Sequence, residues 1–201
     1  MKRNAKSANK LRGGELHNDA PPPASPGSLS TYQVDENLRD GTPVCVRAVR
    51  PGDKAMFETA FDRQSAETIH SRFFHFKREL SDCDLKNFTE VDFDNHVGLI
   101  MTIVENNEER LIGVGRFVRE ASEDEAESAF VVDDEYQGRG AASSLLQHLV
   151  KLARRLGITI FKAYVQADNL NMLGVFERSG LPMTKTAEGD ITQIVLRFAP
   201  E

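Results

Sequence analysis

Two glycines, Gly138 and Gly140, stand in a stretch whose residue types suit phosphate binding, Gln-Gly-Arg-Gly-Ala-Ala at 137–142. The apolar run at 129–132 before it predicts a strand, and the leucines after it predict an amphipathic helix. The first turn of a helix leaves backbone N–H groups without intrahelical partners, and the helix dipole makes that end positive. Because glycine lets the backbone come close to a ligand, this order of elements predicts an anion at the helix start.

The helix is supported by apolar residues that recur at three- and four-residue spacing from Ala142 to Leu156, and Gly157 marks its expected end. By itself a Gly-x-Gly pair also fits an ordinary turn. Nucleotide-binding motifs fit poorly, because no third glycine stands at dinucleotide spacing and the sequence has no Gly-Lys-Ser/Thr of a P-loop.

Placed between a strand and this helix, Gln-x-x-Gly-x-Ala at 137–142 resembles the acyl-CoA-binding motif of the GNAT N-acetyltransferases. Downstream, residues 158–165 resemble the next strand of that family. Asn169 and the Phe-Glu-Arg-x-Gly at 176–180 resemble its following helix. The likeness covers about residues 44–198 and implies the fold and the donor substrate of the family.

Three upstream segments resemble a narrower group, the acetyltransferase domain of bacterial Pat-type protein-lysine acetyltransferases. They are Ser-Arg-Phe-Phe at 71–74, Arg-Glu-Leu-Ser-Asp at 78–82 and Thr-Glu-Val-Asp at 89–92. Pat-type enzymes are known for acetylating acyl-CoA synthetases. This resemblance therefore implies acetyl-CoA as the donor and a protein lysine as the acceptor.

The resemblance also implies which residues bind acetyl-CoA. The pyrophosphate cradle would consist of Gln137, Gly138, Arg139, Gly140, Ala141 and Ala142. Backbone groups of Phe130, Val131 and Val132 would pair with the pantetheine arm, where the strands 127–132 and 158–166 splay apart. Asn169 resembles a residue that contacts the cofactor, and it fits equally well as the N-cap of the helix that follows.

An amine acceptor must lose a proton, because the reference pKa of lysine is near 10.4 and neutralising the amine at pH 7 costs roughly 4 kcal/mol. Glu127 begins a strand ten residues before Gln137 and alternates with Ala129 and Val131 on one face. Its position resembles that of the catalytic glutamate of protein-lysine acetyltransferases, which predicts a general base. The alternative is a solvated charge at a strand start, in a segment rich in acidic residues.

No tyrosine stands at the family's usual position for the acid that protonates the leaving group, so either water protonates the thiolate or no acid is needed. Many family members use a tyrosine, and Phe176 stands at the matching position. A CoA thiol can leave as a thiolate near neutral pH, since the reference pKa of cysteine is about 8.5; Tyr164 is a weak substitute that better fits the core. Candidates on the acceptor side are Arg72, His75 and Asp92, with a structural ion pair as the alternative for Arg72 and Asp92.

Length and composition define the class of protein. The 201 residues are 28% charged and 40% hydrophobic, as in a soluble globular protein, and no apolar run reaches the length of a transmembrane helix. The first thirty residues carry five Lys/Arg and two Asp/Glu, so with a total charge of −6 the remainder carries −9. This acidic balance argues against nucleic-acid binding.

Residues 1–40 lack periodicity and are rich in Ser, Asn, Gly and Pro, which predicts a flexible tail before one domain at 41–201. No apolar stretch follows the basic residues near the start, so we expect no secretory signal. Cys45 and Cys83 form no disulfide or metal motif, and the histidines have no metal-ligand spacing. We therefore expect free thiols, no metal and a cytoplasmic location.

The pattern along the chain predicts an α/β (α+β) fold. Predicted strands lie at 44–49, 97–104, 111–118, 127–132, 158–166, 182–187 and 191–198, and helices begin near Pro51, at Ser65 and Ser81, after the glycine turn and at Asn169. We expect a GNAT-like mixed, mostly antiparallel sheet of about six to seven strands, flanked by helices and built around a central βαβ acyl-CoA-binding unit.

These observations favour a GNAT N-acetyltransferase that transfers an acetyl group directly from acetyl-CoA to an amine. A protein lysine is the favoured acceptor, with an acyl-CoA synthetase as an example of a partner. No cysteine stands where the nucleophile of a two-step transfer is expected. The alternatives are acetylation of a small amine, and a non-catalytic acyl-CoA sensor.

Overall fold

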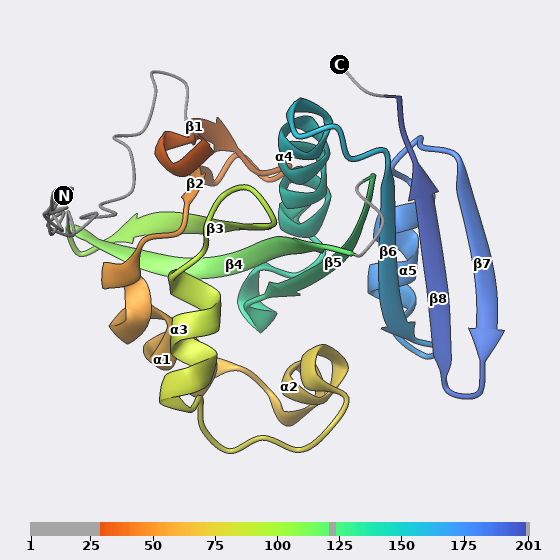
Figure 1. Ribbon diagram of the computed structural model, residues 1–201. Coiled ribbons are helices and arrows are strands. Elements are labelled where there is room, and N and C mark those ends of the chain that lie inside the picture. The colour runs from red at the N-terminus through yellow and green to blue at the C-terminus, as the bar shows by residue number, and fades with distance from the viewer. Residues whose placement is uncertain (1–28, 121–123, 200–201) are drawn as a thin grey trace, which may run out of the picture.

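The protein is described by a computed structural model over residues 29–120 and 124–199, and its centre is one sheet in the order β1-β2-β3-β4-β5-β6-β8-β7 (Figure 1). The strands are β1 Gln33–Asn37, β2 Pro43–Ala48, β3 His96–Glu105, β4 Glu108–Arg119, β5 Glu125–Val132, β6 Ile160–Gln166, β7 Met183–Glu188 and β8 Ile191–Arg197. Neighbouring strands run antiparallel except β5 and β6, which are parallel. The predicted mixed, mostly antiparallel sheet is confirmed.

Five α-helices and three short 3₁₀ segments connect the strands. They are α1 Lys54–Arg63, α2 Ala66–Phe73, α3 Asp82–Thr89, α4 Ala141–Arg155 and α5 Leu170–Glu177, with η1 Leu29–Thr31, η2 Pro51–Asp53 and η3 Asp134–Tyr136. The serines predicted to cap two helices do so, because Ser65 accepts a hydrogen bond from the backbone N–H of Thr68 and Ser81 accepts one from Asp84.

The sheet has eight strands, one more than the sequence suggested, because β1 lies in the segment assigned to the tail. Leu29 and Leu38 are buried on either side of this strand, so residues 29–40 are part of the fold, and residues 1–28 lie outside the described residues. Only one of the five residues of β1, Val34, is apolar, so its sequence carries no strand pattern. Antiparallel pairing with β2 stabilises β1 as a strand although its sequence lacks an apolar pattern.

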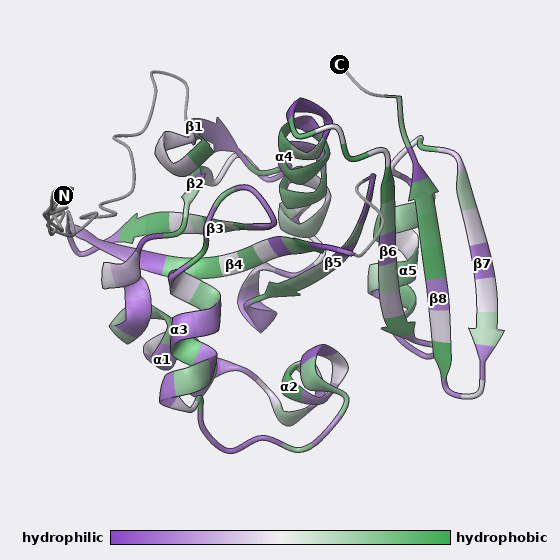
Figure 2. Ribbon diagram, in the orientation of Figure 1, coloured by the Kyte–Doolittle hydropathy of each residue, from purple (hydrophilic) through white to green (hydrophobic). Residues whose placement is uncertain are grey.

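Two apolar layers cover the faces of the sheet. α4 and α5 lie on one face, and α1, α2 and α3 lie on the other (Figure 1). The α4 layer includes Leu145 and Leu149 against Phe117, and the α1–α3 layer includes Phe57 and Leu85. Figure 2 shows the corresponding apolar residues along the strands and on the inner surfaces of the helices.

The parallel pair β5–β6 separates soon after it begins. Only three residues of each strand are paired, 125–127 with 160–162, although β5 stays paired with β4 to Val132 and β6 stays paired with β8 to Gln166. Beyond the last pair, the Ser128 hydroxyl donates to the Lys162 carbonyl at 3.2 Å. The backbone of 129–132 therefore faces a gap instead of a neighbouring strand.

Gly115 of β4 allows α4 to approach the sheet closely. A Cβ on Gly115 would lie 3.2 Å from Leu149 Cδ1, 3.2 Å from Phe130 Cδ1 and 3.3 Å from Leu145 Cβ. Gly115→Ala should therefore lower the free energy of unfolding by about 1–3 kcal/mol through overpacking, as measured by urea denaturation. Gly52→Ala is the matched control, because nothing lies within 4 Å of its Cβ position. Equal stability of the two variants would contradict this account of the α4 contact.

Candidate functional site

A cleft of about 740 Å³ opens where β5 and β6 separate, between α2 and the beginnings of α4 and α5. Ten of the eleven residues predicted for the site line it: Glu127, Phe130, Val131, Val132, Gln137, Gly138, Gly140, Ala141, Ala142 and Asn169. The eleventh, Arg139, does not line the cleft. The structure thus brings together residues that are up to forty-two positions apart in the sequence.

The glycine turn at 137–142 has the backbone geometry that only glycine adopts easily. Gly138 and Gly140 have φ angles of +74° and +101°, in the left-handed region, and Gly140 precedes the first residue of α4. In the described part of the chain, no group accepts a hydrogen bond from the backbone N–H groups of residues 138–143. These N–H groups and the positive end of the α4 dipole can therefore bind an anion.

The side chain of Arg139 points away from the cleft. Its guanidinium is 3.2 Å from Asp40 Oδ2 and lies 4.8 Å from the centroid of the Tyr136 ring. A different arginine lines the cleft beside the turn, Arg39, whose side chain lies 3.1 Å from the position of a Cβ on Gly140. The sequence analysis missed Arg39 because it lies in the segment assigned to the tail, far from the motif.

Asp134 connects the glycine turn to α2. Its carboxylate accepts hydrogen bonds from the backbone N–H of Ser65 at 2.7 Å and from the Thr68 hydroxyl, both at the start of α2. The same carboxylate accepts from Gln137 Nε2 at 3.0 Å, and Gln137 also donates to the Val132 carbonyl at 3.3 Å. The Gln137 side chain therefore braces the turn against the end of β5.

Glu127 stands at the last paired position of β5 before the strands separate, and its side chain is exposed in the cleft. It shares a face of the sheet with Ala129 and Val131, as expected, and this is the face that α2 covers. No described residue forms a hydrogen bond or ion pair with the Glu127 carboxylate. By contrast, the neighbouring Glu125 is 2.6 Å from Lys162 Nζ.

The far wall of the cleft contains Asn169, Phe176 and Tyr164. Asn169 caps α5, because its Oδ1 accepts a hydrogen bond from the backbone N–H of Met172 at 2.9 Å. Phe176 is buried against Phe130, with ring centroids 6.0 Å apart, and supplies no hydroxyl. Tyr164 is not a core residue as expected, because alternation along β6 turns it into the cleft, where it is 38% exposed.

Of the acceptor-side candidates, Arg72 lines the cleft, while His75 and Asp92 do not. The Asp92 carboxylate accepts the backbone N–H groups of residues 94–96, which lowers its pKa despite partial burial. His75 Nδ1 lies 2.7 Å from the Phe73 carbonyl. Asp92 is therefore a loop-forming residue, and His70 is the histidine that reaches the cleft.

The described residues contain no cluster of three or more side chains suited to a metal ion. Both cysteines are free, and neither lines the cleft; burial is the main cause that raises the pKa of Cys45 to about 11. Over residues 29–120 and 124–199, no helix has the length and hydropathy needed to cross a bilayer.

Comparison with known proteins places this chain in a family. Residues 62–181 match the acetyltransferase (GNAT) family. An acetyltransferase of Pseudomonas aeruginosa is 29% identical over 164 residues, which are 82% of this chain and 88% of that protein. Acetyltransferase Pat of Mycolicibacterium smegmatis is 35% identical over 148 residues, 73% of this chain and 44% of that protein. The chain thus spans less than half of the Mycolicibacterium protein.

Comparison with solved structures indicates the same family as the sequence comparisons. The crystal structure of the GNAT domain of S. lividans PAT has a TM-score of 0.76 and 34% identity to this chain, over 83% of this chain and 97% of that domain. Acetyl-CoA binding is typical of GNAT proteins. The eight-stranded sheet with its separated parallel pair is accordingly a GNAT fold, and the chain belongs to the GNAT acetyltransferase family, as an acetyl-CoA-dependent transferase similar to the Pat acetyltransferases.

Proposed function

We propose that the protein transfers an acetyl group from acetyl-CoA directly to the side-chain amine of a protein lysine, with Glu127 as the general base. One observation carries this assignment: Glu127 is an exposed carboxylate without a partner among the described residues, and it stands where β5 and β6 separate. A base at this point lies beside residues 129–132 of β5, whose backbone faces the cleft.

The donor substrate would lie along the cleft, with its pyrophosphate at the glycine turn. The free N–H groups of Gly138, Arg139, Gly140, Ala141 and Ala142 would hold the pyrophosphate, while Gln137, whose own N–H donates to the Asp134 carbonyl, would keep the turn in shape. Arg139 takes part through its backbone, because its side chain is engaged by Asp40. Arg39 lies beside Gly140 and would supply the cation at this end of the cleft.

The separated strand provides the next contacts. Phe130, Val131 and Val132 line the cleft, and the backbone of 129–132 has no neighbour on the β6 side. The amides of the pantetheine arm would pair with these groups in the place that a neighbouring strand would otherwise occupy. Asn169, which caps α5, lines the opposite wall of the cleft and would contact the arm from there.

Acetyl-CoA supplies an acetyl thioester at the point where the strands part. Glu127 would accept the proton of the lysine ammonium, which frees the nitrogen lone pair for attack. The new bond joins this nitrogen to the thioester carbonyl carbon, and the carbon–sulfur bond breaks with its electron pair on sulfur. The acylated nitrogen then releases a second proton to solvent and becomes a neutral amide. Phe176 offers no proton to this sulfur, and a CoA thiol is acidic enough to leave as the thiolate.

The choice of a protein lysine is supported by the similarity to Pat acetyltransferases in both sequence and structure. An acyl-CoA synthetase is a suitable acceptor to test first, and small amines form the alternative class. The two free thiols support a cytoplasmic location as part of the same proposal.

Replacement of the base by an isosteric amide gives a direct test. Glu127→Gln should reduce kcat about 10²–10⁴-fold while acetyl-CoA still binds, because the amide keeps the shape but cannot accept the proton. The measurement is thiol release from acetyl-CoA with an acyl-CoA synthetase or a small amine as acceptor, beside calorimetric binding of CoA.

Glu125→Gln is the matched control, because it removes the same charge from the same face of β5, two residues away, and should retain most of the activity. Equal turnover of Glu127→Gln and wild type would remove the base assignment. Binding of CoA without release for every acceptor would favour an acyl-CoA sensor.

The two arginines near the turn give a second test. Arg39→Gln should raise the KM for acetyl-CoA about tenfold, because a cation in hydrogen-bonding reach of a phosphate is lost. Arg139→Gln should change it less than about threefold, because it removes only an exposed ion pair with Asp40. Steady-state kinetics with varied acetyl-CoA measures both. A larger effect at Arg139 would reverse the assignment of the cation.

A further inference from the structure

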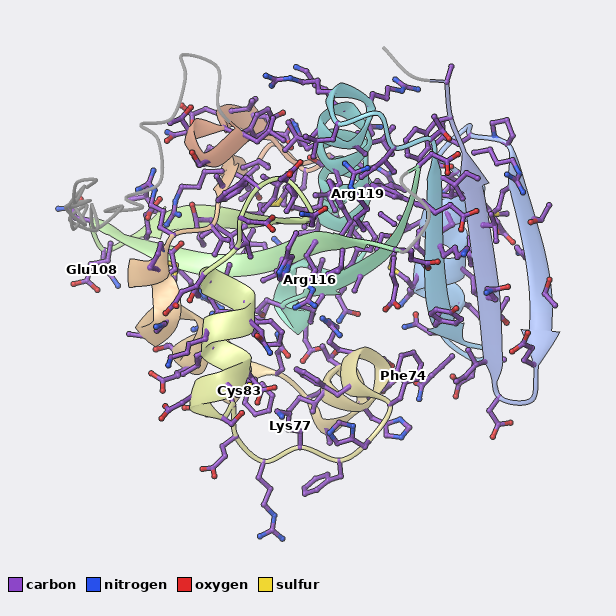
Figure 3. All side chains as sticks on the ribbon, in the orientation of Figure 1. Phe74, Lys77, Cys83, Glu108, Arg116 and Arg119 are labelled. Atoms are coloured by element: carbon purple, nitrogen blue, oxygen red, sulfur yellow. The ribbon has the colours of Figure 1, made fainter. Side chains whose placement is uncertain are left out.

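Two arginines meet on the face of the sheet where the acceptor would approach Glu127. Arg72 comes from the last turn of α2 and Arg116 from β4, directly opposite Ala129 of β5. Their guanidinium carbons lie 5.9 Å and 5.3 Å from the centroid of one shared ring, that of Phe88. Figure 3 shows Arg116 between β4 and the helices that cover this face.

Neither guanidinium has a carboxylate partner. No hydrogen bond or ion pair joins Arg72 or Arg116 to another described residue, and Arg116 Nη1 is buried without any hydrogen-bond acceptor. By contrast, the fully buried Arg47 has carboxylate partners, at 2.9 Å from Asp53 and 2.9 Å from Glu109. A shielded cation without a partner is costly, so two such arginines side by side need an explanation.

The local charge is not balanced by the protein itself. Burial and the proximity of Arg116 lower the pKa of Arg72 to about 10, and burial lowers the pKa of Arg116, while Glu127 opposes both shifts. Burial, followed by the charge of Arg116, lowers the pKa of the adjacent His96 to about 4, so His96 is neutral at pH 7. The carboxylate near His96 is that of Asp92, and it already accepts hydrogen bonds from backbone N–H groups. Two cations therefore face one carboxylate.

Arg72 is open to the main cleft, and Arg116 borders the cavity next to it. Arg72 lines the main cleft together with Glu127, and it also lines a small adjoining cavity of about 40 Å³ that reaches Arg116 and Phe88. Ala129 and Val131 line both spaces, so they adjoin along β5. The planar N–H groups of arginine match the two oxygens of a carboxylate, and the aromatic ring beneath holds the guanidiniums in place.

We propose that Arg72 and Arg116 form a subsite for a carboxylate that the acceptor carries close to the amine to be acetylated. Since this subsite deepens the transferase function proposed above, in a protein acceptor the carboxylate is an aspartate or glutamate near the target lysine. In a small acceptor it is the carboxylate of an amino acid. The bound carboxylate neutralises the excess cation and holds the amine beside Glu127.

Binding measurements test the subsite without requiring turnover. The probes are short lysine peptides with one glutamate at each near position on either side of the lysine, and the same peptides with glutamine. Leucine and leucinamide probe the small-acceptor source. Affinities are measured by calorimetry in the presence of CoA, for the wild type, Arg72→Gln, Arg116→Gln and the control Arg78→Gln. Arg78 is an exposed arginine that lies over Phe76 in the loop after α2.

At least one acidic probe should bind the wild type and Arg78→Gln about tenfold more tightly than its amide counterpart. In Arg72→Gln and Arg116→Gln this preference should fall below about twofold. If only one of these variants folds, that variant alone decides. Preference among the peptides identifies a protein carboxylate, and preference for leucine over leucinamide identifies a small acceptor.

Equal affinity of the wild type for all acidic and amide probes would overturn the subsite. A preference that persists in the arginine variants would do the same. Failure of the proposed function looks different: the acidic preference is present, but no peptide or amine receives an acetyl group from acetyl-CoA.

Discussion

The separation of β5 from β6 after three residue pairs is the constraint on which the site depends. A strand end without a neighbour is unfavourable, because its N–H and C=O groups lose their partners. Here each strand keeps its other neighbour, β4 for β5 and β8 for β6, so both remain fixed while the space between them opens. The Ser128 hydroxyl bonds to the Lys162 carbonyl at the point of separation. The gap is therefore a stable part of the sheet, and a ligand with amide groups can complete it.

The glycine turn and α2, which line different parts of the cleft, are linked through Asp134. One carboxylate holds the N-terminus of α2 and the Gln137 side chain of the glycine turn. Because α2 also carries Arg72 and His70 into the cleft, the position of this wall is tied to the geometry of the turn. A donor that orders the turn would then also order the wall against which the acceptor is proposed to bind. This arrangement suits a direct transfer, in which both substrates occupy the cleft together.

Much of this structure followed from local patterns. The serine caps of α2 and α3, the apolar stripe of α4 and the left-handed glycines of the turn are each defined by a few neighbouring residues. The residues that sequence reasoning missed depend on distant partners. β1 is held by β2 rather than by its own pattern, and Arg39 reaches the turn only because β1 and β2 close the sheet edge beside it. Tyr164 is an aromatic residue in a mostly apolar strand, which is typical of a core position. It is exposed because alternation along β6 turns it into the gap between β6 and β5.

The acidic residues around β5 differ in their partners, and this difference distinguishes the proposed base, Glu127, from its neighbours. Lys162 lies 2.7 Å from Glu120 and 2.6 Å from Glu125, and these carboxylates raise its pKa, which keeps the lysine charged and both acids paired. Glu127 faces the same side of the sheet, but it stands at the opening, where Lys162 is already occupied. A carboxylate that is exposed to the cleft and has no fixed partner can take up a proton without breaking an existing ion pair. The pairing of Lys162 with Glu120 and Glu125 thus leaves Glu127 without an ion-pair partner among the described residues.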